Sequence, residues 1–443
     1  MDKEKLTSEY IKKSWAGAVK KKDVDPNFIM PCDYIPPCVD GDLINLYYWD
    51  TYFTNKGLYI DGLDEYAFGN IQNLRFSLNK FGCVPNMCRA NGADYASQPP
   101  LLFLMVKDYY ARHENKEWLA GAVADLEKEY DFWMTKRTTP TGLNRYGCNY
   151  DYENGDCDIS YYAGRVGLDA SSFTREQKIE CNINRICEGE SGEDHTPRFS
   201  NRAFYVAPID LNCYLYAFEC TLAEFCRICG KDFKVWQSRA ENRLALIVKY
   251  CFDEESGVFF DYDYEKGVRT GVCCAACYLP FVFGISNDKT ALSAVNAELV
   301  LPHGVASCQK VKDDGCVYQW GYPNSWAPHN FWAYEANKAV GLTETAEKIR
   351  KTYLDTLSTE YVSSGKLYEK YDGEKGGKAT VNEYGLPEML GWTAGVYEYF
   401  YNENVRISDP IRTIFAPSSR FVQSHKRTEL VVVCAAQNRL LRR

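Results

Sequence analysis

A stripe of apolar residues at helical spacing is the feature that most constrains the fold of this chain. In residues 208–230, apolar side chains recur at alternating steps of four and three: Leu211, Leu215, Phe218, Leu222, Phe225 and Cys229. These steps place side chains on one face of an α-helix. Gly230 follows the stripe, and glycine is common just beyond the C-terminus of a helix. The segment therefore predicts a helix with one buried face.

Similar periodicity runs through much of the chain, over residues 57–81, 99–113, 116–135, 233–252, 329–340, 344–357 and 386–402. Short strands are expected around residues 258–264, without the regular alternation of strands and helices that a parallel sheet requires. Loops rich in Gly, Asn, Asp, Tyr and Trp connect the helical ranges. The pattern predicts an all-α fold, a toroid of helices whose loops form a cleft at one end.

Composition and charge exclude several classes of function. The 443 residues are 46% hydrophobic and 25% charged, which is not the composition of a disordered or fibrous chain. The net charge of −9 disfavours a nucleic-acid or anionic-membrane partner. No run of 18 apolar residues occurs in the sequence, and the lysine-rich first 22 residues lack the apolar core of a secretory signal. We therefore expect no membrane partner and a cytoplasmic location.

The 19 cysteines are expected to be reduced and mostly buried. Disulfide scaffolds are short, secreted chains, whereas this chain is long. Two Cys-x-x-Cys pairs, Cys226/Cys229 and Cys274/Cys277, stand far apart in the sequence, and a structural zinc site needs four ligands. Glycine-rich nucleotide loops and the His-Glu-x-x-His metal motif do not occur in the sequence. The sequence predicts no cofactor.

Composition divides the chain into three parts. Residues 1–40 are a lead-in that contains a lysine-rich helix, residues 41–406 form the main domain, and residues 407–443 form a basic tail. The tail has seven Lys and Arg against two Asp and Glu, which leaves −14 for the rest of the chain. We expect the tail to be an appended, loosely ordered segment. The sequence predicts no particular oligomeric state.

Four loop-like segments combine carboxylates and amides with aromatic rings. They are residues 47–53, residues 86–100, residues 190–199, and the group formed by 319–328 and 369–372. Aromatic rings cover the apolar C–H faces of a sugar, and carboxylates and amides bind its hydroxyls. Each segment alone is equally compatible with core packing. Their occurrence together, in a chain with 15% aromatic residues, predicts a sugar-binding cleft.

These segments also carry the motifs of a known family, because the chain resembles the trehalases, glycoside hydrolase family 37, and more distantly family 63. The matching strings occur in the family's order: Tyr-Tyr-Trp-Asp-Thr-Tyr-Phe (47–53), Ser-Gln-Pro-Pro-Leu-Leu (97–102), Glu-Ser-Gly-Glu-Asp (190–194), Asp-Leu-Asn-Cys (210–213), Gln-Trp-Gly-Tyr-Pro-Asn-Ser-Trp-Ala-Pro (319–328), Glu-Lys-Tyr-Asp (369–372) and Gly-Trp-Thr-Ala-Gly-Val (391–396). The resemblance implies an (α/α)6 barrel, in agreement with the all-α prediction. It also implies an inverting glycoside hydrolase that cleaves an α-glycosidic bond in a small neutral saccharide.

By position in the family's motifs, Asp194 is expected to be the general acid and Glu369 the general base. In an inverting enzyme the acid protonates the departing oxygen and the base activates water, and the two carboxyl groups are roughly 6.5–9.5 Å apart. Read without the resemblance, Asp194 would serve as a helix N-cap or as an ion-pair partner of Arg198. Glu374 and Glu383 compete with Glu369 for the role of base.

The resemblance also implies a set of substrate-binding residues. Trp49 and Asp50 are expected to serve as platform and hydroxyl acceptor for the glycosyl residue, Asn86 and Gln98 to bond hydroxyls, and Gln319, Trp320 and Trp326 to line the opposite wall. Glu383 corresponds to a position that contacts water or sugar. For each tryptophan, core packing is the alternative.

The chain departs from the family where the family uses arginine. Asp42 and Ala96 stand at two arginine positions, residues 149–165 replace a segment that carries a third, and Gly321 replaces an aspartate. Arg89, Arg145 or Arg165 are the arginines that remain to substitute for them. Because arginine binds vicinal hydroxyls in a fixed plane, these losses alter what the pocket holds.

Several functions therefore stay open at this point. Trehalose, another α-glucoside, an α-mannoside or a glycosylglycerate fits the retained acid and base. A saccharide-binding protein of the same fold with lost or altered turnover is the alternative from another class. Phosphorolysis is a weaker alternative, because an enzyme that uses phosphate needs no base to activate water.

Overall fold

The computed structural model describes residues 2–39, 43–90, 96–147, 149, 158–166, 169–312, 316–380, 385–388 and 390–403. Most elements in these residues are helices: α1 (Lys3–Ala18), α2 (Tyr48–Ile60), α3 (Asp64–Phe81), α4 (Leu102–His113), α5 (Lys116–Lys136), α6 (Ser160–Val166), α7 (Arg175–Ser191), α8 (Ile209–Ile228), α9 (Lys234–Cys251), α10 (Leu279–Val282), α11 (Lys289–Leu299), α12 (Ala327–Val340), α13 (Thr343–Ser364) and α14 (Gly391–Tyr401).

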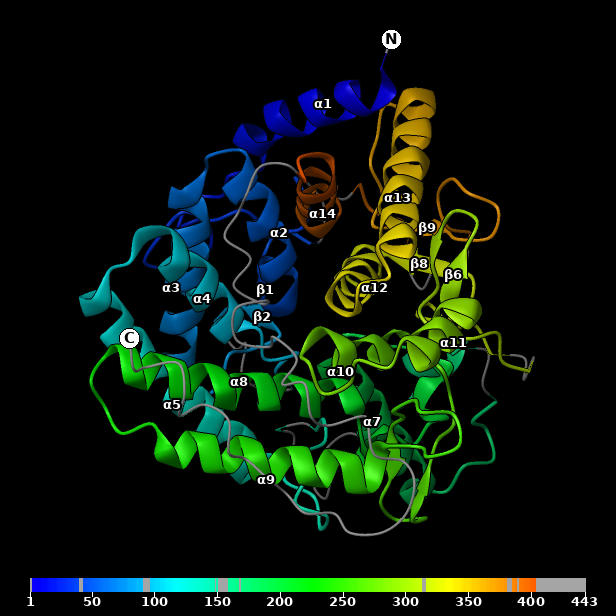
Figure 1. Ribbon diagram of the computed structural model, residues 1–443. Helices are drawn as coiled ribbons and strands as arrows, with labels where there is room; N and C mark the ends of the chain where they lie inside the picture. The colour runs from blue at the N-terminus through cyan, green and yellow to red at the C-terminus, as the bar shows by residue number, and fades with distance from the viewer. Residues whose placement is uncertain are drawn as a thin grey trace.

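The helices form two concentric layers (Figure 1). The inner layer is a closed ring in which α2 packs against α4, α4 against α8, α8 against α10, α10 against α12, α12 against α14, and α14 again against α2. Outside it lie α3, α5, α9, α11 and α13, and α1 covers α13 and α14. This arrangement is the (α/α)6 barrel, which confirms the fold predicted from the sequence. Within the described residues, none of the helices combines the length and the apolar character needed to cross a membrane.

The composition of the inner helices explains their place in the ring. In α2 every residue from Tyr48 to Tyr59 is buried, because apolar and aromatic side chains occupy all of its faces. The outer helices α9 and α13 bury one stripe only. Gly57 of α2 lies against Gly395 of α14 so closely that a Cβ atom on Gly57 would be 2.6 Å from the Gly395 Cα. Two glycines thus let these inner helices meet at backbone distance.

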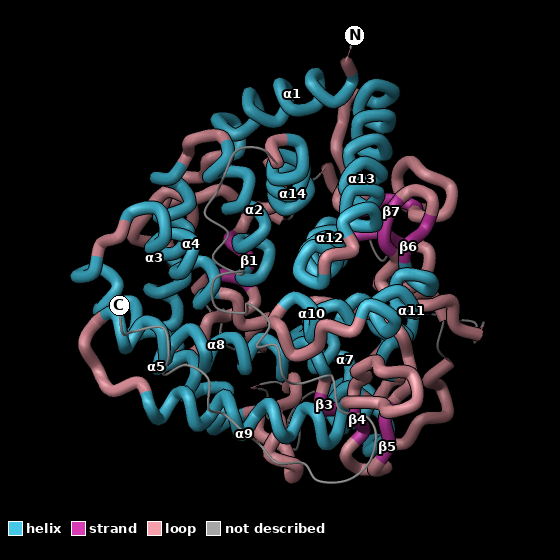
Figure 2. Tube along the Cα trace, in the orientation of Figure 1, coloured by secondary structure: helices cyan, strands magenta, loops and turns pink. Residues whose placement is uncertain are grey.

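The short strands lie in the loops rather than in a central sheet (Figure 2). They form the antiparallel pairs β1 (Leu46–Tyr47) with β2 (Met87–Cys88), β6 (Val300–Leu301) with β7 (Gly304–Val305), β8 (Asn324–Trp326) with β9 (Lys370–Asp372), and the three-stranded β3 (Val206–Ala207), β4 (Tyr262–Asp263) and β5 (Val268–Arg269). Strands β1, β3 and β8 lead directly into α2, α8 and α12. They therefore mark the N-terminal ends of the inner helices, where the positive ends of the helix dipoles gather.

Several boundaries differ from those that the sequence predicted. Residues 47–53, expected in a loop, begin α2, because burial inside the ring outweighs the modest helix propensity of Tyr, Trp and Thr. Residues 57–81 form two helices instead of one, since the chain turns at Gly62 with φ of 74°. Helices α6, α7, α10 and α11 were not predicted. The strand expected around residues 258–264 is reduced to Tyr262–Asp263.

Helix α1 is docked on the barrel, since Trp15 Nε1 donates to Asp61 Oδ2 at 2.7 Å and Lys3 pairs with Asp355 at 2.6 Å. The basic tail, residues 407–443, lies outside the described residues.

All cysteines in the described ranges are free and most are buried, as expected for thiols that serve packing.

Candidate active site

Four tryptophans from three separate segments form one buried cluster. The rings of Trp320 and Trp326 stack flat with centroids 3.7 Å apart. Trp392 stands edge-on to them and to Trp49, with centroid separations of 5.6–6.1 Å. Trp49 lies 5.7 Å from Trp320, so the two rings share one cluster instead of facing each other across a cleft. The cluster creates a water-poor aromatic wall at the N-terminal ends of α2, α12 and α14.

Asp194 lies in a tight turn that rests on this wall. Helix α7 ends at Ser191, and Gly192 follows in the left-handed conformation with φ of 77°. A Cβ atom on Gly192 would be 2.7 Å from Cε2 of Trp49, so only glycine fits. Next in the turn, Glu193 and His195 are buried, while Asp194 between them is half-buried. The turn therefore packs against Trp49 through Gly192 and leaves Asp194 in partial contact with solvent.

The fit of Gly192 against Trp49 predicts a measurable loss of stability in Gly192→Ala. A left-handed alanine costs about 1–2 kcal/mol, and overlap with the indole adds about 1–3 kcal/mol. Gly82 is a matched control, since it caps α3 with φ of 79° and an added Cβ would meet nothing within 4 Å. Gly82→Ala should therefore show the backbone cost alone. Urea unfolding of the two variants measures the difference, and equal losses would contradict the contact with Trp49.

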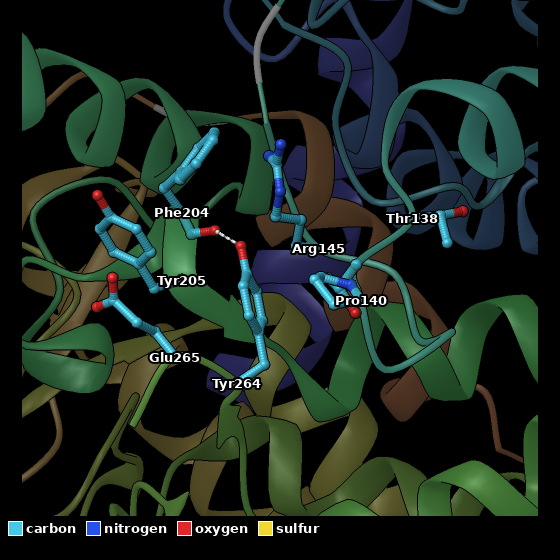
Figure 3. Close-up of a pocket in the computed structure, with 8 residues that line it drawn as sticks. Thr138, Pro140, Arg145, Phe204, Tyr205, Tyr264 and Glu265 are labelled. Carbon is cyan, nitrogen blue, oxygen red and sulfur yellow. Dashed lines mark hydrogen bonds between the residues drawn. The ribbon is translucent and has the colours of Figure 1, made fainter. Parts of the chain in front are cut away.

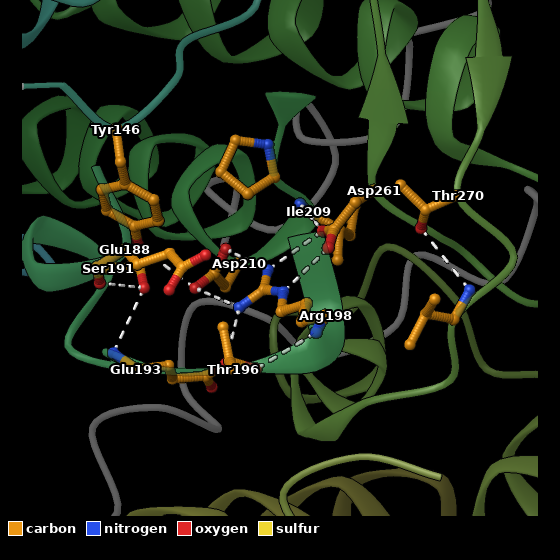
Figure 4. Close-up of polar contacts among 12 residues, drawn as sticks. Tyr146, Glu188, Ser191, Glu193, Thr196, Arg198, Ile209, Asp210, Asp261 and Thr270 are labelled. Atoms are coloured by element: carbon orange, nitrogen blue, oxygen red, sulfur yellow. Dashed lines mark hydrogen bonds and ion pairs between the residues drawn. The ribbon is translucent and has the colours of Figure 1, made fainter. Parts of the chain in front are cut away.

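A buried arginine binds the same turn through Glu193 (Figure 4). The Arg198 guanidinium pairs with Asp261 and Asp210 at 2.7 Å each and with Glu193 at 3.2 Å. His329 Nε2 lies 3.0 Å from the other Glu193 oxygen. Burial alone would raise the pKa of Glu193, but the charges of Arg198 and His329 outweigh it and lower that pKa. Arg198 thus pairs with these three carboxylates, which disfavours the alternative in which Asp194 is its partner.

Glu190 fastens the turn to the segment that carries Gln98. Arg137 binds both Glu190 oxygens at 2.7 Å, and the backbone N–H groups of Ser97 and Gly147 donate to Glu190 at 2.8 and 2.6 Å. Gln98 Oε1 then accepts from the backbone N–H of Trp49 at 3.1 Å. Sequence analysis predicted no role for Glu190 or Arg137, because their pairing across 53 residues has no local signature.

Asp50 shares the site with both of the predicted catalytic carboxyl groups. The pKa of Asp50 is raised to about 8. Burial is the largest cause, and the charges of Glu369 and Asp194 add to it. The raised pKa favours the protonated form of Asp50, and a protonated carboxyl group donates a hydrogen bond as well as accepting one. The three carboxyl groups come from the start of α2, the turn after α7 and the residue before β9.

Glu369 is buried, with 3% of its surface exposed, and it lies next to a buried cation. Lys370 Nζ is 3.4 Å from Glu369 Oε2 and donates to Gln319 Oε1 at 3.0 Å. The same ammonium group lies 4.5 Å from the centre of the Trp326 ring. Lys370 is part of the motif Glu-Lys-Tyr-Asp, but no role was predicted for it. Its position directly after Glu369 was the sequence signal that it belongs to the site.

Of the two residues that compete with Glu369 for the role of base, the structure describes Glu374 and not Glu383. Glu374 is exposed, and the Tyr322 hydroxyl donates to it at 2.9 Å. It therefore lies on the surface and not in the buried carboxyl cluster. Glu383 lies outside the described residues, as does Asp42, so their predicted places stay predictions.

Asn86, Ala96 and Gly321 all lie within the described part of the chain. Asn86 joins β2 to the Gln98 segment through its backbone, since its N–H donates to the Ala96 carbonyl at 2.9 Å. Its side-chain Oδ1 is buried and has no hydrogen-bond partner within the described ranges. Ala96 is buried. Gly321 has no room for the aspartate that the family carries, because a Cβ there would be 2.8 Å from Tyr318 Cβ.

The arginines that remained as substitutes do not all face this site. Arg145 lies over the Phe204 ring at 3.8 Å and lines a separate pocket of about 450 Å³ with Tyr205, Tyr264 and Glu265 (Figure 3). None of the predicted site residues lines that pocket. Arg89 is half-buried, and the side chain of Arg165 lies outside the described part of the chain. Among the described residues, no group of three or more His, Cys, Asp and Glu side chains is arranged to hold a metal.

Comparison with known proteins identifies the family of this chain. A family model described as Trehalase matches residues 4–163 and 181–404. The periplasmic trehalase of Pseudomonas aeruginosa is 29% identical over 404 residues, which cover 83% of this chain and 70% of that enzyme. The cytoplasmic location predicted from the sequence is contradicted by this relative, whose name places it in the periplasm. The lack of a recognisable export signal was therefore insufficient evidence for a location.

Solved structures support the same fold. The neutral trehalase Nth1 of Saccharomyces cerevisiae superposes with a TM-score of 0.70 at 25% identity, covering 93% of this chain and 82% of that one. The mannosylglycerate hydrolase of Thermus thermophilus, a family 63 enzyme, gives a TM-score of 0.60 at 16% identity over 90% of this chain and 99% of that one. The second likeness concerns the fold alone.

Proposed function

This chain belongs to the trehalase family of glycoside hydrolases, and we propose that it hydrolyses trehalose with inversion at the anomeric carbon, with Asp194 as general acid and Glu369 as general base. The observation that carries the proposal is the convergence of Asp50, Asp194 and Glu369 beside one buried tryptophan cluster. In such a dry site, carboxyl groups take different protonation states, as acid–base hydrolysis requires.

The different surroundings of the two carboxyl groups support their roles. Asp194 is half-buried in a turn that packs against Trp49, and it interacts electrostatically with the carboxyl groups of Asp50 and Glu188; carboxyl groups that share one site disfavour one another's ionised forms. Glu369 has the Lys370 ammonium 3.4 Å away, which favours its ionised form. Asp194 therefore donates a proton to the departing oxygen, while Glu369 accepts one from the attacking water. No metal or organic cofactor enters this reaction scheme.

The substrate is proposed from the relatives and from the residue types of the site. A relative from Pseudomonas aeruginosa and a structural neighbour from Saccharomyces cerevisiae are both named as trehalases. Trp49 would cover the apolar face of one glucose unit, while Asp50, Asn86 and Gln98 would serve its hydroxyl groups. Trp49, Asn86 and Gln98 carry no charge, which suits a neutral disaccharide.

Proton NMR of the first turnovers of trehalose tests this proposal. Inversion converts one glucose unit to the β-anomer and releases the other as the α-anomer, so we expect equal amounts of both before mutarotation. Retention would release two α-anomers and would contradict the mechanism. A panel of α-glucosides, α-mannosides and glycosylglycerates run in parallel identifies the substrate. Tight binding by calorimetry without any turnover would instead favour the saccharide-binding alternative.

A further inference from the structure

Lys370 occupies an unusual position for a lysine. Its side chain is completely buried at the start of β9, opposite Trp326 of β8 in the strand pairing. Glu369 precedes the strand in a bend, which lets the side chains of these two consecutive residues meet. The Nζ atom lies 3.0 Å from Gln319 Oε1 and 3.4 Å from Glu369 Oε2. One ammonium group therefore joins the proposed base, a predicted substrate-binding amide and the aromatic wall.

Burying an ammonium group removes its hydration, and its partners must compensate for that loss. Another lysine, Lys56 of α2, is equally buried, but it pairs with Asp108 at 2.5 Å away from the carboxyl cluster, and its charge lies over the Tyr52 ring at 4.7 Å. Lys370 has a longer and shared contact with its carboxylate. A side chain selected only for packing would not need the charge at this point.

The positive charge of Lys370 opposes the effect of the acidic groups that surround Glu369. Asp50 from α2 faces Glu369, and the negative charge of Glu369 contributes to the raised pKa of Asp50. Cys38, from the segment before β1, is buried and also lies within the field of Glu369. Asp194 faces Asp50 from the turn after α7. In a dry site these carboxyl groups disfavour one another's ionised forms, and Lys370 is the cation that the described residues place beside Glu369.

We propose that Lys370 is a positioning residue that keeps Glu369 ionised and orients both Glu369 and Gln319 for the reaction. This inference rests on the proposed role of Glu369 as general base. Through its contact with Glu369 Oε2, the ammonium group restricts the orientation of the carboxylate. Through its bond to Gln319 Oε1, it turns the amide so that the NH₂ group points away from the lysine.

The test compares the pH–rate profiles of wild type, Lys370→Met and Lys370→Arg with trehalose as substrate. Methionine keeps the length and apolar stem without the charge, so we expect kcat to fall about 10–100-fold at neutral pH. The acidic limb of kcat/KM, which reports ionisation of the base, should move to higher pH by about one unit. Arginine keeps the charge, and K370R should keep the acidic limb of the wild type.

Lys56→Met is the matched control, because it removes a second buried, ion-paired lysine of the same ring. It should lower the melting temperature without moving the acidic limb. A K370M enzyme whose activity falls equally at every pH, or a K370R enzyme whose acidic limb has moved, would overturn the proposal. Absence of turnover in wild type would instead contradict the proposed function, so the two failures are distinguishable.

Discussion

Asp194→Asn should lower kcat for trehalose by about 10²–10⁴-fold, the usual contribution of a general acid. The departing group is a sugar alkoxide, which leaves slowly unless a proton reaches its oxygen as the bond breaks. Asparagine has the shape of aspartate but no acidic proton to transfer. KM should change little, because the turn at Gly192 and the packing against Trp49 are retained. Steady-state kinetics at neutral pH measure both constants.

A substrate with a better leaving group separates the acid from a purely structural role. With α-glucosyl fluoride the C–F bond breaks without prior protonation, and water activated by Glu369 gives β-glucose and hydrogen fluoride. Asp194→Asn should therefore hydrolyse the fluoride at a rate close to that of wild type. Full activity of this variant on trehalose would exclude Asp194 as the acid. Equal losses on both substrates would assign Asp194 to the structure of the turn.

The ring of helices was predictable because burial leaves a regular trace in the sequence. The stripe from Leu211 to Cys229 became α8, which ends within two residues of the predicted stop at Gly230. Helix α2 was harder, because inner-ring burial on all faces removes the contrast between apolar and polar positions. Residues 47–53 therefore gave no stripe and were assigned to a loop. The all-α architecture survives such errors, since it depends on the sum of many periodic segments.

The sequence motifs of the candidate site were predictable, whereas the hydrogen bonds and ion pairs that join them were not. The motifs indicated that Trp49, Asp194, Trp320 and Glu369 belong together. They did not indicate that Arg198 pairs with three buried carboxylates, or that Glu190 binds both Arg137 and the Ser97 backbone. Three of these contacts, Arg198 with Asp261 and Glu190 with Arg137 and Ser97, join residues more than 50 positions apart, and their geometry is fixed by the packing of the ring. Local periodicity contains no information about them.

Glu369→Ala should abolish hydrolysis of both trehalose and α-glucosyl fluoride, with a loss of about 10²–10⁴-fold on each. The attacking water must lose a proton whichever group departs, so a better leaving group does not replace the base. Glu374→Gln is the control, because Glu374 is exposed and bonded to Tyr322, and it should retain activity close to that of wild type. Loss of activity in the control with survival of Glu369→Ala would reverse the assignment of the base.

Azide provides the sharper test of Glu369, because the alanine leaves space for a small anion where the carboxylate stood. Azide needs no deprotonation, so it can attack the anomeric carbon from the face that water normally uses. The C–N bond forms as the C–O bond breaks, and Asp194 protonates the departing oxygen. The expected product from trehalose is β-glucosyl azide, identified by proton NMR, and Asp194→Asn in the same chain should suppress it. The α-anomer of the azide would place the nucleophile on the other face and exclude the inverting arrangement of Asp194 and Glu369.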